Sequence, residues 1–128
     1  MGSFSFGKDE KLCSQKLIGE LFLSGNTFLC YPLKVVWKIE VLETPHPAQV
    51  VFSVPKRLFK RAHDRNLLKR RMREAYRLRK HELYELLDSN GKKIVFMLVY
   101  IAKEELEFKQ LESAMNKVIA KFGKSIAE

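Results

Sequence analysis

The chain has 128 residues, 46% of them hydrophobic and 30% charged, with a formal net charge of +9. This length and apolar content suit one core, so we expect a single domain over residues 1–128, with its core at about 6–123 and short terminal tails. The longest apolar run, Ile94 to Ala102, is far shorter than the roughly 20 residues of a membrane span, so we expect no membrane partner. No secretory signal pattern is present, and Cys13 and Cys30 suit reduced thiols. We therefore expect a cytoplasmic protein.

The first predicted element is a short helix between Ser14 and Gly25. A serine hydroxyl commonly caps a helix start, and glycine commonly follows a helix end. Four apolar residues share one predicted face of this helix: Leu17, Ile18, Leu21 and Phe22.

Extended structure is predicted next, over residues 28–42 with an interruption at Pro32, and a short extra strand at Thr27–Tyr31 would be its first part. Alternating positions of the second part are apolar: Val35, Trp37, Ile39 and Val41. This alternation predicts a strand with one buried face. Two prolines make Thr44–Pro47 a turn, because proline cannot continue a strand ladder, and Gln49–Val54 is the next strand.

Positive charge is concentrated in the following segment, Lys56 to Lys80. It holds 12 of the 24 Lys and Arg residues, opposed only by Asp64 and Glu74, whereas the rest of the chain has 12 basic and 13 acidic residues. A charge excess so localised is typical of a protein that binds a polyanion, and nucleic acid is the first candidate.

Most of this segment is predicted to be a helix, capped by Asp64 and ending near Leu87, before Ser89-Asn90-Gly91. At about 100° per residue, polar residues occupy one arc of roughly 100°: Asn66, Lys69, Arg70, Arg73 and Arg77. An apolar stripe occupies the adjacent arc: Leu68, Met72, Ala75, Leu83 and Leu86. Such a helix can contact phosphates through arginine forks while its apolar stripe is buried. The alternative is a basic face that is merely solvated.

The last two predicted elements are a strand and a helix. Ile94–Ile101 lacks alternation, which predicts a strand buried on both faces. The helix is predicted over Glu104–Phe122, with one apolar face: Leu111, Met115, Val118 and Phe122. The order α-β-β-β-α-β-α predicts an α/β (α+β) two-layer sandwich, with about four strands in a mixed sheet and three helices.

One family shares these features. The sequence Arg65 to Arg77 resembles the Arg-Asn-Arg motif helix of the protein subunit of bacterial ribonuclease P. Phe52–Arg57 is similar to that family's strand end and basic turn, and Phe6–Gly25 is similar to its opening segment and first helix. The resemblance covers most of residues 4–122.

The chain departs from the family pattern at three places. Leu67 stands where the motif has its second Arg, Pro55 replaces a small polar residue, and the link from Arg57 to Arg65 is one residue longer than is common.

The resemblance implies a left-handed parallel crossover in the sheet and a ribonucleoprotein endonuclease that removes the 5′ leader of precursor tRNA. It further implies that a catalytic RNA subunit binds most of the Mg²⁺, so we expect no catalytic and no metal-ligating residue in this chain. The implied partners are the ribonuclease P RNA and precursor tRNA. The expected RNA-binding residues are Lys56, Arg57, Lys60, Arg61, Arg65, Asn66, Lys69, Arg70, Arg73 and Arg77.

Two aromatic residues are candidates for leader binding. Phe22 and Trp37 occupy positions where the family has aromatic residues lining a cleft for the single-stranded leader. Bases stack on such rings with about 1–3 kcal/mol each and little sequence preference. Each ring fits a core equally well, because Trp37 shares the alternation of Val35 and Phe22 shares a helix face with Ile18. Both interpretations stay open at the level of sequence.

Two other functions are compatible with a basic chain. One is a ribosomal protein or RNA chaperone with no role in cleavage, and the other is a free-standing nuclease. The nuclease is disfavoured because the carboxylates are scattered and no carboxylate obviously orients His46, His63 or His81.

Overall fold

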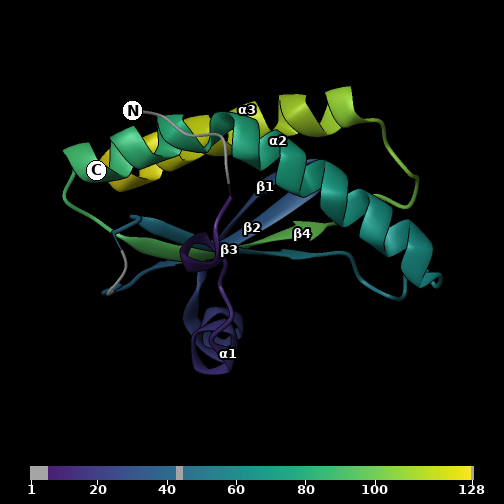
Figure 1. The fold of residues 1–128 in the computed structure, drawn as a ribbon, viewed down its shortest axis with the longest axis horizontal. Coiled ribbons are helices and arrows are strands. Elements are labelled where there is room, and N and C mark those ends of the chain that lie inside the picture. Colours follow the sequence, from purple (N-terminus) through teal and green to yellow (C-terminus); the bar gives the residue numbers. More distant parts are fainter. Residues whose placement is uncertain (1–5, 43–44, 128) are drawn as a thin grey trace.

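A computed structural model describes residues 6–42 and 45–127 of the chain. In chain order, the elements are a 3-10 turn η1 (Lys8–Glu10), α1 (Gln15–Ser24), β1 (Asn26–Cys30), β2 (Leu33–Ile39), β3 (Ala48–Ser53), α2 (Ala62–Ser89), β4 (Ile94–Tyr100) and α3 (Phe108–Ala127). The strands form one sheet in the order β1-β2-β4-β3, in which only β3 and β4 are parallel. Helices α2 and α3 cover one face of the sheet and α1 lies on the other (Figure 1).

The predicted α/β fold, with a mixed sheet of four strands and three helices, is therefore confirmed. The parallel pairing of β3 with β4, joined through α2, is the crossover that the resemblance implied. Its left-handedness stays a prediction.

Helices on both sides give the sheet two apolar cores. Trp37, Phe96 and Val50 are register partners across neighbouring strands and point into the larger core, under α2 and α3. Val36 and Val95 point the other way, into a smaller core under α1. Strand β4 contributes to both cores, which confirms that it is buried on both faces.

Helix α1 has the predicted start and end. The Ser14 hydroxyl accepts a hydrogen bond from the Leu17 amide at 3.2 Å. At Gly25 an added Cβ would lie 2.7 Å from the Leu21 carbonyl oxygen and 2.7 Å from a Val36 methyl group. Glycine is therefore required here by the close approach of α1 to β2.

The predicted start of α2 is wrong by three residues. The helix begins at Ala62, after Arg61, and Asp64 is its third residue rather than its cap. The Arg65 guanidinium, which donates to backbone carbonyls of the preceding turn, holds this start without a capping side chain. The helix ends at Ser89, and Gly91 follows with a φ of 63°, a left-handed conformation that glycine adopts without strain.

The predicted bounds of α3 are also wrong at both ends, since it runs from Phe108 to Ala127. The Tyr100 hydroxyl donates to the Glu104 carbonyl and accepts from the Leu106 amide, so the segment before the helix stays non-helical. The predicted buried face is confirmed, and Ile126 extends it by one turn.

The single buried face predicted for β2 is wrong at Val36, which is buried in the smaller core, and the burial of Val35 and Trp37 does not continue along the rest of the predicted strand. Ile39 is half exposed and Val41 is 91% exposed, because β2 ends at Ile39 and Val41 lies beyond the covered part of the sheet. Thr44, part of the predicted turn, lies outside the described residues, whereas Pro45, His46 and Pro47 form a bend.

Candidate nucleic-acid interface

The predicted basic surface forms along the β3–α2 connection and the outer side of α2. We call it the α2 basic face, made up of Lys56, Arg57, Lys60, Arg61, Asn66, Lys69, Arg70 and Arg73. All are exposed except Lys69, which is half-buried. Within residues 6–42 and 45–127, none of these side chains forms a hydrogen bond or ion pair. Their donors are therefore available to a ligand.

Two residues predicted to bind RNA contact the protein instead. Arg65 donates at 2.8 Å to the carbonyl oxygens of Phe59 and Lys60, so it fixes the turn that enters α2. Arg77 forms an ion pair with Glu74, one turn back on the same helix. The pairing holds the pKa of the Glu74 carboxyl below its ordinary value, chiefly through the Arg77 hydrogen bond. Arg77 thus neutralises an acid beside the α2 basic face.

Other cations of α2 point toward the rest of the fold. Arg71 donates to the Leu106 carbonyl oxygen at 2.7 Å and lies 3.4 Å from a carboxylate oxygen of Glu105. Arg79 lies 3.5 Å from a carboxylate oxygen of Glu112 on α3. The helix therefore separates its cations by face, some packing the protein together and others facing solvent.

A buried ion pair that the sequence gave no reason to expect anchors the N-terminal segment to α2. Glu10 accepts hydrogen bonds from Lys80 and Tyr84, and its second carboxylate oxygen accepts from the Gly7 amide at 2.9 Å. Burial raises the pKa of Glu10, but the hydrogen bonds from Lys80, Tyr84 and Gly7 outweigh it and hold that pKa below its ordinary value. Glu10 and Lys80 are 70 residues apart, so no local pattern links them.

The two aromatic candidates for leader binding lie on opposite sides of the sheet. Trp37 is 7% exposed, and its ring centroid lies 5.7 Å from that of Phe122 in the larger core. Phe22 is 72% exposed on α1. The structure therefore does not bring the two rings together, and the position of Trp37 matches the core interpretation.

A concave surface that the sequence did not predict lies beside the α2 basic face. A cavity of about 240 Å³ is lined by Phe6, Lys11, Leu12, Cys13, Val50, Val51, Phe52 and Arg73. The rings of Phe6 and Phe52 meet edge to face with centroids 6.0 Å apart. An apolar cavity with Lys11 and Arg73 at its rim has the composition that suits a nucleobase and its phosphate.

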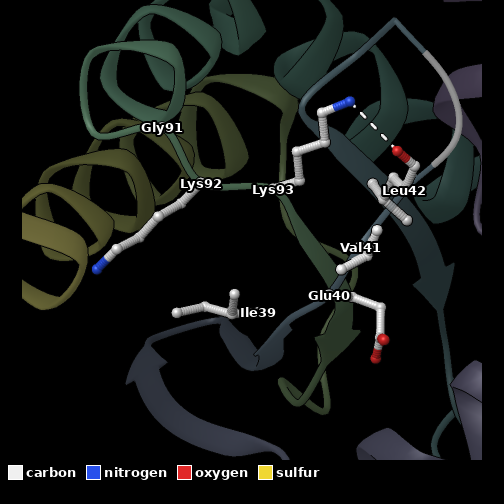
Figure 2. Close-up of a pocket in the computed structure, with 7 residues that line it drawn as sticks. All are labelled: Ile39, Glu40, Val41, Leu42, Gly91, Lys92 and Lys93. Atoms are coloured by element: carbon white, nitrogen blue, oxygen red, sulfur yellow. Dashed lines mark hydrogen bonds between the residues drawn. The ribbon is translucent and has the colours of Figure 1, made fainter.

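A larger hollow, of about 440 Å³, lies at the other end of α2, between the end of β2 and the start of β4 (Figure 2). Its two lysines serve the fold, because Lys93 donates to the Leu42 carbonyl oxygen at 3.2 Å and Lys92 to that of Ile126 at 3.1 Å. The exposed part of its lining includes the apolar side chains of Ile39 and Val41. We assign no ligand to this hollow.

Among the residues that the structure describes, no three His, Cys, Asp or Glu side chains come together in a way that could hold a metal ion. Nor does this part of the chain contain a helix with the length and apolar character that a membrane crossing requires.

Comparisons with known proteins agree with this geometry. The family model Ribonuclease P matches residues 6–123. The chain is 32% identical over 124 residues to the ribonuclease P protein component of Porphyromonas gingivalis, covering 97% of this chain and 90% of that one. Two solved structures share the fold: the RNase P protein of Thermotoga maritima (TM-score 0.68, 17% identity, 88% and 96% coverage) and that of Staphylococcus aureus (TM-score 0.65, 18% identity, 88% and 94% coverage).

Proposed function

The chain belongs to the ribonuclease P protein family, and on this premise we propose that its α2 basic face binds the RNA subunit of ribonuclease P, the ribonucleoprotein that removes 5′ leaders from precursor tRNA. A ribosomal or chaperone function is not favoured by these relatives. We place the complex in the cytoplasm.

One observation carries the assignment of the RNA contact. Seven cations on one surface have no hydrogen bond or ion pair among the described residues, although α2 also carries four arginines that do. Like charges at i, i+4, such as Lys69 and Arg73, destabilise a helix by a few tenths of a kcal/mol per pair. RNA phosphates would remove that repulsion, and arginine forks match phosphate oxygens.

The protein would contribute binding, and the RNA subunit the chemistry. In this proposal Mg²⁺ is held mainly by the RNA subunit. The cations near the N-terminal end of α2, Arg70 and Arg73 among them, would offset the repulsion between RNA segments that a divalent ion also screens. No side chain of this protein is given a catalytic role.

Leader binding is proposed at two apolar surfaces. The exposed ring of Phe22 on α1 can stack on a base, and the cavity between Phe6 and Phe52 can accept one next to Arg73. Trp37 would act indirectly, by supporting β2 from within the core. Stacking of this kind tolerates leaders of varied sequence.

The deciding experiment adds the purified protein to precursor tRNA with and without a ribonuclease P RNA at low Mg²⁺. We expect cleavage only with the RNA, and faster cleavage when the protein is present. Cleavage by the protein alone would identify a nuclease, and the absence of stimulation would leave a ribosomal or chaperone function.

A further inference from the structure

We propose that the outer face of α3, together with Tyr31, is a second RNA-contact surface that takes a single-stranded segment of RNA. We call it the α3 lysine face: Tyr31, Lys109, Lys117, Lys121 and Lys124. The inference rests on the proposed function, because it assumes an RNA partner. It adds a second contact with RNA, made by residues outside α2.

Charge on α3 is separated by face. At about 100° per residue, the four lysines fall within an arc of roughly 120° on the exposed side of the helix. The one acidic residue within α3, Glu112, lies outside that arc and contacts Arg79 of α2. The exposed arc therefore has no acidic side chain of its own helix. The sequence does not reveal this local excess of positive charge, because acidic residues elsewhere in the chain balance these lysines in the total count.

An exposed aromatic ring lies between these lysines. Tyr31, in the β1–β2 turn, is 62% exposed. It lines one hollow of about 400 Å³ together with Lys117 and Lys121. It also lines a second hollow of about 480 Å³ with Lys109, but Glu104 lines that hollow too, so we place the phosphates next to Lys117 and Lys121. An exposed ring next to cations is the arrangement by which proteins stack an unpaired base and bind the phosphates beside it.

The edge of the sheet at this surface is poorly suited to another strand. Lys121 donates to the Leu29 carbonyl oxygen of edge strand β1 at 2.7 Å, and its ammonium group lies 5.7 Å from the centre of the Phe28 ring. Positive charge at the edge of a sheet discourages strand addition, and here the ammonium group of Lys121, which comes from α3, occupies one carbonyl of the edge strand. An ammonium group has three donors, so Lys121 can still contact a phosphate. These contacts favour a polyanion over a strand of another protein.

The α3 lysine face is separate from the α2 basic face. The connection from β4 to α3 carries three exposed acidic residues, Glu104, Glu105 and Glu107. Glu105 is held against α2 by Arg71. One RNA strand crossing this acidic connection would meet repulsion, so we assign the two surfaces to different RNA segments.

The test uses the full-length protein with ribonuclease P RNA and with precursor tRNA, measuring affinity as a function of salt. We expect Lys117→Gln with Lys124→Gln to weaken binding of one of these RNAs about tenfold, and to make its log–log salt slope shallower by roughly 1.5. Tyr31→Ala should weaken binding of the same RNA by about fivefold or more and leave the slope unchanged. The matched control is Lys103→Gln, an exposed lysine in the acidic connection.

Unchanged affinity of the α3 variants for both RNAs would overturn the inference. Binding of the same lysines to vesicles of anionic lipid would not rescue it, because the proposed ligand is RNA. The double variant Arg70→Ala, Arg73→Ala is measured in parallel. If it loses RNA binding while the α3 variants do not, the proposed function holds and only the further inference fails. If neither set of variants changes RNA affinity, the proposed function itself fails. Thermal unfolding of each variant shows whether weakened binding is a loss of fold.

Discussion

The effect of each cation in α2 depends on the face of the helix where it lies. Arg70 and Arg73 are exposed to solvent. Arg71 and Arg79 lie only a few residues away in the sequence, but Arg71 contacts Leu106 and Arg79 contacts Glu112. The side-chain chemistry is the same in all four. Substitutions on the two faces should therefore have different consequences, one for RNA affinity and the other for folding.

We expect Arg70→Ala and Arg73→Ala each to cost about 1.5–3 kcal/mol of binding free energy with ribonuclease P RNA, because a charge-assisted hydrogen bond is lost. Arg79→Ala is the matched control on the same helix and should leave this affinity nearly unchanged. The measurement is a binding titration at fixed salt, with thermal unfolding alongside. Equal losses of affinity for all three variants would contradict the assignment by face.

The two aromatic candidates should respond to truncation in opposite ways. We expect Trp37→Ala to cost about 3–5 kcal/mol of folding free energy, because it leaves a large cavity next to Phe122. Phe22→Ala should leave the melting temperature nearly unchanged, because the ring is mostly exposed. Instead it should weaken binding of precursor tRNA with a leader, but not of mature tRNA. Equal effects of Phe22→Ala on both tRNAs would remove that ring from the leader site.

At the scale of elements, α2 combines two tasks along its 28 residues. Its first half carries the helical part of the α2 basic face, and its second half holds the N-terminal segment through Lys80 and Tyr84. That segment also forms a bridge from Lys11 to Val50 of β3, and it places Phe6 beside Phe52. The buried ion pair therefore supports one wall of the cavity that opens next to Arg73.

We expect Glu10→Gln to destabilise the protein by about 3–5 kcal/mol, because Lys80 would stay buried without its countercharge. Its pH dependence follows from the lowered pKa of Glu10 in the folded state. The stabilisation is fully present above the unfolded-state pKa, near 4.5, and is lost as pH falls through the lower folded-state pKa.

Urea unfolding at neutral and acidic pH measures both effects. The control is Glu112→Gln, which breaks the more exposed pair with Arg79 and should cost about 1 kcal/mol or less. A Glu10→Gln variant as stable as the wild type at neutral pH would show that the buried pair contributes nothing.

At the scale of the whole molecule, exposed lysines and arginines gather on two surfaces. The α2 basic face and the α3 lysine face lie on helices that pack side by side on one side of the sheet (Figure 1). Helix α1, on the opposite side of the sheet, carries the exposed Phe22. Base stacking on Phe22 is thus assigned to the side of the sheet opposite the two cationic surfaces, whereas stacking on Tyr31 and next to Arg73 is assigned to the same side as the cations.

If the protein neutralises about five to eight phosphates, affinity for ribonuclease P RNA should fall on the order of 10³-fold between about 50 and 200 mM salt. The measurement is the slope of log affinity against log salt concentration. Arg70→Ala should make the slope shallower by about one unit or slightly less, whereas Phe22→Ala should not alter it. A nearly flat salt response of the wild-type protein would contradict an electrostatic interface.

Periodicity and local residue chemistry act over a few neighbouring residues, and they were enough to predict the order of helices and strands, the caps of α1, the burial of β4 on both faces and the cationic arc of α2. Three features could not be predicted in this way: the pairing of Lys80 with Glu10, the late start of α3 after the contacts of Tyr100, and the position of Trp37 in the core on the opposite side of the sheet from Phe22. The same holds for which cations are already bonded and which remain available. Each of these outcomes depends on partners that the fold brings together from distant elements, and such contacts leave no periodic pattern along the chain.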